Sequence, residues 1–205
     1  MVFSPGDVTR SYGPFKPATH HGTVVGGDWD LQHHHFSTNP LARAALQHWR
    51  DGVDWEDTGV VELQLRRIRE YGPALADGMA TRDDIMRRYE RLDQLFELVR
   101  RVGELPPHAR PRDLIYLHLD RTGEAIFGHR GVHRFVITHV LRVPSVTAQL
   151  GAVHAAAPQS PWLRLAVRAG FNFQDRLAPA GPVRRRSVFA PRADRRATGR
   201  RAPAA

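Results

Sequence analysis

The chain has 205 residues, 41% of them hydrophobic, and a formal net charge of +9. It contains no cysteine, which excludes disulfides, thiolate metal ligands and cysteine catalysis. No apolar run is long enough for a signal peptide or a membrane span, so we expect a cytoplasmic protein with no membrane partner.

The positive charge is concentrated near the C-terminus. Residues 175–205 hold nine arginines and two acidic residues, a net charge of +7, which leaves +2 for residues 1–174. A protein that binds nucleic acid is expected to carry a basic face on its folded part. We therefore expect contact with nucleic acid, or with an acidic partner, only through this tail.

The first 80 residues are expected to form a leader and a helical extension. Residues 1–21 are rich in Pro, Gly, Ser and Thr and predict a flexible leader. Residues 22–80 predict an N-terminal helical extension that contains a Gly-Gly-Asp-Trp-Asp segment. Its expected elements are an edge strand near 23–30 and helices over 40–50 and 59–71, with Pro40 at the first helical position and Gly52 at an end.

Residues 81–154 are expected to form the core of an α+β fold. Thr81 and Asp84 predict a capping box for a helix over 82–102, in which apolar residues recur every three or four positions. Strands are predicted over 113–119, 124–127 and 145–154, with a helix over 132–141. Together these elements predict a small mixed β-sheet packed with helices.

The C-terminal region, unlike the core, is expected to be mostly without regular structure. Residues 155–205 predict a short helix over 161–169 and then a basic tail, mostly disordered, in which Ala, Pro and Arg dominate without a period.

The segment Gly131-Val132-His133-Arg134 lies where a predicted loop becomes a helix. Backbone N–H groups at a helix N-terminus are unpaired and favour anions. The segment therefore predicts a phosphate- or nucleotide-binding box, with His133 and Arg134 as donors. Three cationic or polar neighbours could assist it: Arg121, His129 and Arg130. The alternative is a capped helix start with Arg134 paired to a carboxylate.

The order of elements resembles the ParB/sulfiredoxin superfamily over about residues 23–154. It is closest to uncharacterised microbial proteins that combine Gly-Gly-Asp-Trp-Asp, Trp-Glu-x-Thr and Gly-x-His-Arg segments, here residues 26–30, 55–58 and 131–134. The resemblance implies a ParB/sulfiredoxin-like core that receives nucleotide phosphates at the box, with ATP or CTP and magnesium as possible ligands.

Three departures narrow what the resemblance implies. Val132 stands where sulfiredoxins carry their reactive cysteine, which excludes sulfinic-acid reduction. No helix-turn-helix pattern follows His154, which argues against DNA partitioning. Arg130 stands where many relatives carry an acid or amide, which weakens a kinase interpretation.

Several acids and histidines have alternative interpretations. Asp28, Asp30 and Asp120 are candidate catalytic acids or magnesium ligands. Trp29 between the first two acids predicts a core anchor, and the acids themselves either face a ligand or cap a turn. No metal site is expected at His33-His34-His35, because adjacent side chains of an extended chain point in opposite directions.

Three hypotheses for function follow. The first is a nucleotide- or phosphate-binding domain of unknown specific activity. The second is a nucleotide-dependent small-molecule kinase or phosphotransferase that uses one of the three aspartates. The third is a non-catalytic interaction module whose basic tail contacts nucleic acid or an acidic partner.

Overall fold

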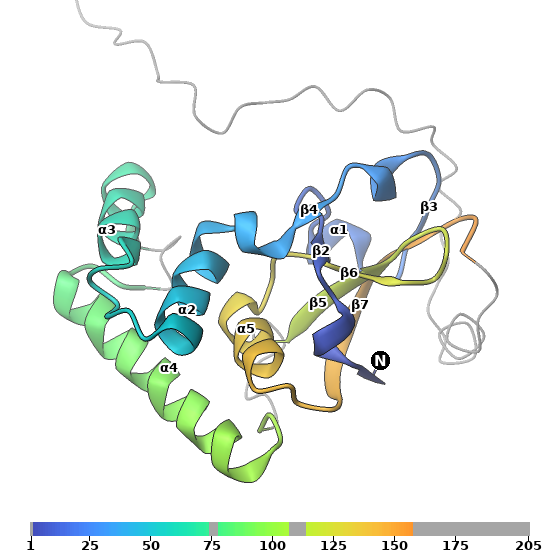
Figure 1. The fold of residues 1–205 in the computed structure, drawn as a ribbon. Coiled ribbons are helices and arrows are strands. Elements are labelled where there is room, and N and C mark those ends of the chain that lie inside the picture. Colours follow the sequence, from blue (N-terminus) through green and yellow to red (C-terminus); the bar gives the residue numbers. More distant parts are fainter. Residues whose placement is uncertain (1, 74–77, 107–113, 158–205) are drawn as a thin grey trace, which may run out of the picture.

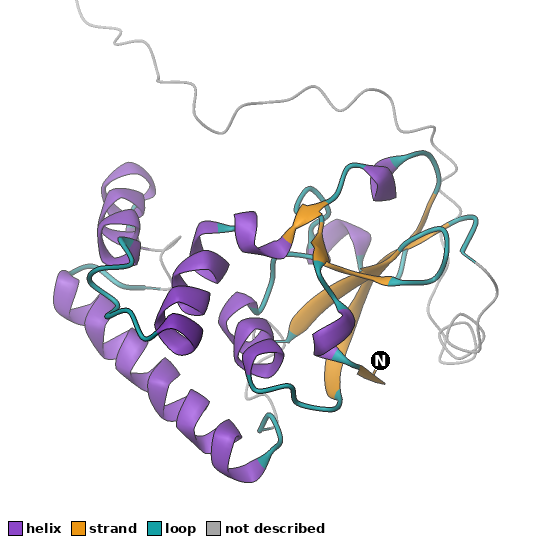
Figure 2. Ribbon diagram, viewed as in Figure 1, coloured by secondary structure: helices purple, strands orange, loops and turns teal. Residues whose placement is uncertain are grey.

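The computed structural model describes residues 2–73, 78–106 and 114–157. A group of helices lies on one side of the molecule and a twisted sheet on the other, with helix α5 between them (Figures 1 and 2). The described residues form five α-helices, three short 3-10 helices and seven strands. The predicted α+β class is therefore confirmed, and the predicted short helix over 161–169 lies outside the described residues.

Four helices make up most of the helical part. They are α2 (Pro40–Asp51), α3 (Val60–Tyr71), α4 (Arg82–Val102) and α5 (Val132–Val140). Asn39 caps α2 by accepting from the N–H groups of Leu41 and Ala42, and the predicted capping box of Thr81 and Asp84 is present at α4. None of the described helices is both long and apolar enough to cross a membrane.

The sheet has the strand order β1-β7-β5-β6-β2-β4, with β3 also paired to β7. Its strands are β1 (Val2–Phe3), β2 (Arg10–Ser11), β3 (Val24–Val25), β4 (His34–His35), β5 (Ile115–Leu119), β6 (Ala125–Phe127) and β7 (Val146–His154). The pairing is mixed. β5 runs parallel to β7 and antiparallel to β6, across the predicted turn.

The flexible leader predicted for residues 1–21 is wrong for residues 2–20. β1 pairs with β7, β2 pairs with both β4 and β6, and α1 (Pro17–His20) lies beside β7. Val8 and Tyr12 are 3% and 4% exposed, so this segment supplies core side chains. Strands of two residues are too short to show the alternation by which a strand is recognised.

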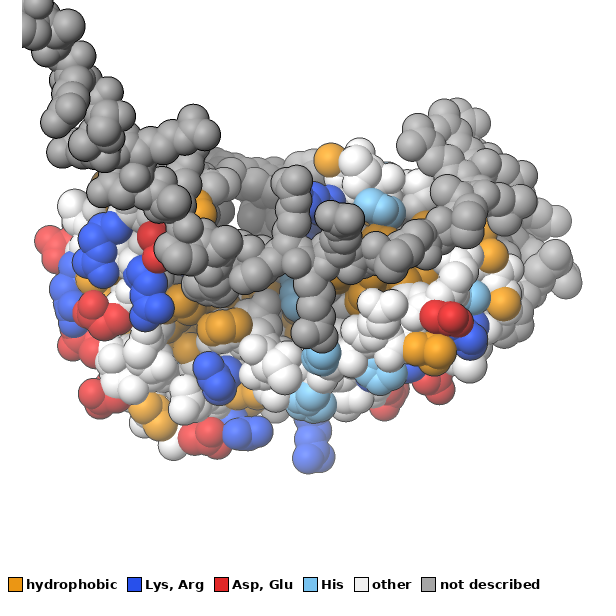
Figure 3. All heavy atoms as spheres, turned by 90° about the horizontal axis from the view of Figure 1, so that it is seen from above, with side chains coloured by type: hydrophobic (Ala, Val, Ile, Leu, Met, Phe, Trp, Pro, Cys, Tyr) orange, Lys and Arg blue, Asp and Glu red, His pale blue; other side chains and the backbone are white. Residues whose placement is uncertain are grey.

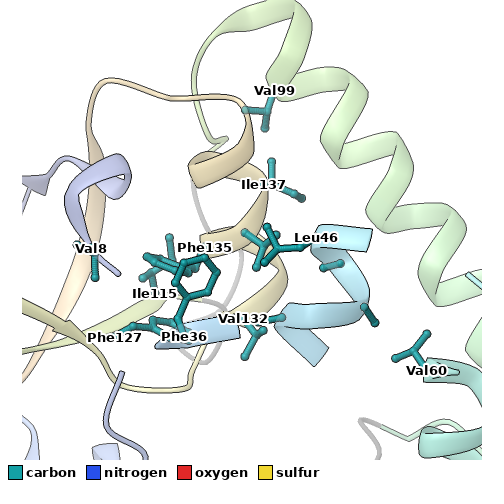
Figure 4. Close-up of a cluster of buried hydrophobic side chains, with 14 of the residues drawn as sticks. Val8, Phe36, Leu46, Val60, Val99, Ile115, Phe127, Val132, Phe135 and Ile137 are labelled. Atoms are coloured by element: carbon teal, nitrogen blue, oxygen red, sulfur yellow. The ribbon is translucent and has the colours of Figure 1, made fainter. Parts of the chain in front are cut away.

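The main core lies where α5 packs between the sheet and helices α2 and α4. Phe127 of β6 stacks on Phe135 of α5 with ring centroids 4.3 Å apart, and Phe36 contacts Phe135 edge to face. Figure 4 shows these side chains together with Val132 at the start of α5 and Leu46 of α2. α5 is consequently buried along most of its length, and only its two ends approach the surface.

Candidate anion-binding site

The predicted box begins at Gly131, which packs closely against strand β5. Gly131 has φ 69°, and a Cβ atom there would lie 2.9 Å from the carbonyl oxygen of Leu114 and 3.0 Å from Cα of Ile115. The lack of a side chain therefore lets the start of α5 approach the backbone of β5. This close approach is to another part of the protein rather than to a ligand.

The next two residues of the box point into the core. Val132 and His133 are each only 8% exposed. The His133 ring lies near those of Tyr89 and Trp49, at centroid distances of 5.6 and 6.5 Å. Burial, helped by the charge of Arg88, lowers the pKa of His133 to about 3. The structure therefore places a neutral imidazole between α2, α4 and α5, away from any phosphate at the surface.

Three other predicted phosphate ligands lie nearer the surface. Arg134 is half-buried, and its Nη1 donates to the carbonyl of Pro106 at 3.5 Å. The carbonyl of Arg130 accepts from the N–H of Tyr116 in β5 at 3.3 Å. His129 has φ 61°, and its ring lies so close to Gly13 that a Cβ there would be 2.5 Å from Nδ1. Each of these three residues therefore contacts a different part of the protein.

Arg121 pairs instead with the two aspartates of the Gly-Gly-Asp-Trp-Asp segment. Its Nε donates to Asp30 at 2.7 Å and its Nη2 donates to Asp28 at 2.8 Å. Asp30 is 2% exposed, and the hydrogen bond from Arg121 is the main cause that lowers its pKa to about 2. Between the acids, Trp29 is 2% exposed and donates to the carbonyl of Val25, as expected of a core anchor.

Asp120 is held in the turn between β5 and β6. It accepts from the N–H groups of Thr122 and Glu124, and its other oxygen pairs with Arg10 at 2.7 Å. Burial alone would raise the pKa of Asp120, but the hydrogen bonds from Thr122 and Arg10 outweigh it and the pKa is lowered. This aspartate stabilises the turn and attaches the N-terminal segment to it.

The three candidate acids do not fit a magnesium site in this arrangement. Asp28 and Asp30 share Arg121, and Asp120 is paired with Arg10. A hard cation would have to displace a guanidinium group from each. In the described ranges, moreover, no three His, Asp or Glu side chains are placed to hold a metal ion.

A different group of residues forms an open hollow of about 670 Å³ beside α2 and α5. Its polar lining is mainly basic. The residues of that lining are His35, Ser37, Arg43, Gln47, Arg50, Asp51, His139 and Arg142. Arg43, Gln47 and Arg50 are four and then three positions apart on α2, so they share one helix face. We refer to this cavity as the arginine hollow.

The arginine hollow has an excess of positive charge. Arg50 pairs with Asp51 at 2.7 Å. Arg43 and Arg142 are exposed, and neither has an ion-pair partner among residues 2–73, 78–106 and 114–157. Elsewhere, on the face seen in Figure 3, acidic and basic side chains alternate over the helical part, whereas histidines gather nearer the sheet.

Arg142 has an unusual backbone conformation at the end of α5. Its φ is 51°, its N–H donates to the carbonyl of His139, and the N–H of Val143 donates to that of Thr138. This pair of hydrogen bonds is the Schellman motif, in which glycine usually occupies the left-handed position. The other three long helices are followed by glycines with positive φ: Gly52, Gly72 and Gly103. An arginine in this position costs about 1 kcal/mol relative to glycine.

The arginine hollow is not among the sites that the sequence predicts. One available signal is the spacing of Arg43, Gln47 and Arg50 along a predicted helix. Another is the arginine at position 142, just before Val143-Pro144, where a helix is expected to end and glycine is the usual residue. His35 and His139 give no local signal, because they are brought together only by the fold.

The chain has no match among family models, curated proteins or solved structures. The resemblance to the ParB/sulfiredoxin superfamily therefore stays a prediction without support from a relative, and the geometry alone carries the functional argument.

Proposed function

We propose that this protein binds a phosphate-bearing small molecule, such as a nucleotide, in the arginine hollow between α2 and α5. The observation that carries the proposal is Arg142, an arginine held in left-handed backbone conformation at the edge of the cavity with no acidic partner in the described structure. Strained backbone at the edge of a cavity is a common feature of functional sites. The ligand class is the one predicted from the sequence, and the position differs.

The charge of the lining supports an anionic ligand. Among the lining residues that the structure describes, three guanidinium groups against the single carboxylate of Asp51 give a net charge of about +2 without the histidines. Guanidinium groups bind phosphate oxygens in pairs, and such charge-assisted hydrogen bonds contribute about 1.5–3 kcal/mol each. Arg43 and Arg142, which have no carboxylate partner in the described ranges, therefore suit a phosphate.

The helix dipole does not account for all three arginines. Arg50 and Arg142 lie at the C-terminal ends of helices, where a positive charge is stabilising. Arg43 is the fourth residue of α2, near the positive end of the helix dipole, where a positive charge is unfavourable. Its position therefore does not serve helix stability, and an anion in the hollow would offset the cost.

The size of the cavity agrees with a small ligand. Its volume of about 670 Å³ lies within the range of about 300–1,000 Å³ typical of small-molecule sites. The phosphotransferase alternative has less support, because Asp51 is the only acid among the described lining residues and is paired with Arg50. The tail of the third hypothesis lies outside the described residues.

Calorimetric titration of inorganic phosphate, ATP, ADP, CTP and GTP, with and without magnesium, tests the proposal. Arg43→Gln and Arg142→Gly should each weaken binding at least about tenfold, because each removes a charge-assisted hydrogen bond. Arg100→Gln is the matched control, since Arg100 is an exposed arginine of α4 outside the cavity lining. Equal affinities in the wild type, Arg43→Gln and Arg142→Gly would contradict the proposal.

A further inference from the structure

We infer that the ligand carries a hydroxyl group close to its phosphate, as a sugar phosphate or the ribose of a nucleotide does, and that His35 and His139 bind this hydroxyl. The inference rests on the proposed function and adds the chemical class of the ligand. It comes from the hydrogen bonds that fix which nitrogen of each imidazole carries a proton.

His139 presents a hydrogen-bond acceptor to the arginine hollow. Its Nδ1 lies 3.0 Å from the carbonyl oxygen of Pro5, which can only accept, so Nδ1 carries the proton. In the uncharged form of this ring, the lone pair is then on Nε2. Nε2 has no hydrogen-bond partner within the part of the chain that the structure describes, and His139 lines the cavity.

His35 presents the opposite group. Its Nδ1 accepts from the backbone N–H of Ser37 at 3.3 Å, which caps the 3-10 helix Phe36–Thr38. The Ser37 hydroxyl lies 2.7 Å from the same nitrogen. Because a backbone N–H can only donate, the proton of the neutral His35 ring is on Nε2. His35 is exposed and lines the same cavity, so it offers an N–H donor.

The two imidazoles flank one aromatic ring. His35 stacks on Phe36 and His139 meets Phe36 edge to face, with ring centroids 4.8 Å apart in each pair. Both imidazoles therefore lie beside Phe36 in the lining of the same cavity, one able to donate and the other able to accept. A fully ionised phosphate ester has no O–H group and only accepts, and its oxygens already have the arginines. A hydroxyl both donates and accepts, so it can satisfy His35 and His139 together.

Two matched esters test the inference: glycerol 1-phosphate, which carries hydroxyls, and propyl phosphate, which has the same carbon chain without them. The wild type should bind glycerol 1-phosphate about tenfold more tightly, as expected for one or two added hydrogen bonds. His139→Asn and His35→Asn should bring this ratio close to one. Asparagine can replace Nδ1 in the contacts with Pro5 and Ser37, but has no group at the position of Nε2.

The outcomes separate the two claims. Equal affinity of the wild type for both esters, or an unchanged ratio in both asparagine variants, overturns the inference about the hydroxyl and leaves phosphate binding standing. Failure of inorganic phosphate and both esters to bind the wild type overturns the proposed function itself. Because the first comparison uses only the wild type, it is decisive even if a variant does not fold.

Discussion

The two ends of helix α5 both have arginines nearby, and they are built differently. At the N-terminal end, Gly131 lies against β5 and His133 is buried between helices. At the C-terminal end, Arg142 is exposed at the edge of a cavity. A glycine before a helix can therefore serve close packing rather than ligand binding. The N–H groups at a helix start can bind a ligand only where the ligand can reach them from the solvent.

The electrostatics of the two ends also differ. The helix dipole favours an anion at the N-terminal end and disfavours it at the other, by about 0.3–1 kcal/mol. A charge-assisted hydrogen bond contributes about 1.5–3 kcal/mol. Two guanidinium groups without carboxylate partners among the described residues therefore outweigh the unfavourable dipole, which is why we propose the ligand at Arg142 rather than at Gly131.

The largest expected change in stability concerns the N-terminal end of α5, where Gly131 packs against β5. Gly131→Ala should destabilise the protein by about 3 kcal/mol, because alanine is strained at φ 69° and its Cβ would meet the backbone of Leu114 and Ile115. Urea unfolding measures the change. Gly52→Ala is the control, since Gly52 has φ 75° but no atom within 4 Å of an added Cβ, and should cost only about 1 kcal/mol. Equal losses would mean that close packing is not the role of Gly131.

A smaller effect should follow from the burial of His133. Its pKa is about 3 in the folded protein and 6.5 in the unfolded chain, so between these pH values the unfolded state binds the extra proton and stability falls as the pH falls. The stability difference between wild type and His133→Phe should shift by about 2 kcal/mol in favour of the variant between pH 7.5 and 5. Urea unfolding at both pH values checks this. A constant difference would indicate that His133 is open to solvent.

At the C-terminal end of α5, Arg142→Gly should stabilise the fold by about 1 kcal/mol, because glycine adopts the left-handed conformation without strain. The midpoint of thermal unfolding should rise by a few degrees. Arg142→Ala keeps the strain and removes the charge, so it should not raise the midpoint. A midpoint of Arg142→Gly no higher than that of Arg142→Ala would show that the backbone at residue 142 is not strained, because both variants lose the favourable charge at the end of α5.

Much of the helical framework could be predicted from the sequence, because its signals are local. The capping box of Thr81 and Asp84, the ending of α2 at Gly52 and the turn that follows β5 at Asp120 are confirmed by the structure. Each depends on a few neighbouring residues. The N-terminal strands were missed because each has two residues and gains its stability from pairing with distant strands.

The predicted box at residues 131–134 shows a second limit of prediction from sequence. The pattern at residues 131–134 correctly indicates a glycine at the start of a helix. It does not reveal that His133 points towards Trp49 and Tyr89, since that depends on how α2 and α4 pack on α5. The described residues of the arginine hollow come from three separate segments, so their convergence could not be predicted from local patterns.

The most direct test of the account compares phosphate binding by Arg142→Gly and Arg134→Ala, one arginine from each end of α5. Nuclear magnetic resonance titration with inorganic phosphate reports both the affinity and the residues that respond. We predict that Arg134→Ala binds like the wild type, with shifts at Arg43 and His139, and that Arg142→Gly binds at least about tenfold more weakly. Loss of binding in Arg134→Ala with wild-type affinity in Arg142→Gly would contradict the account and return the site to the predicted box.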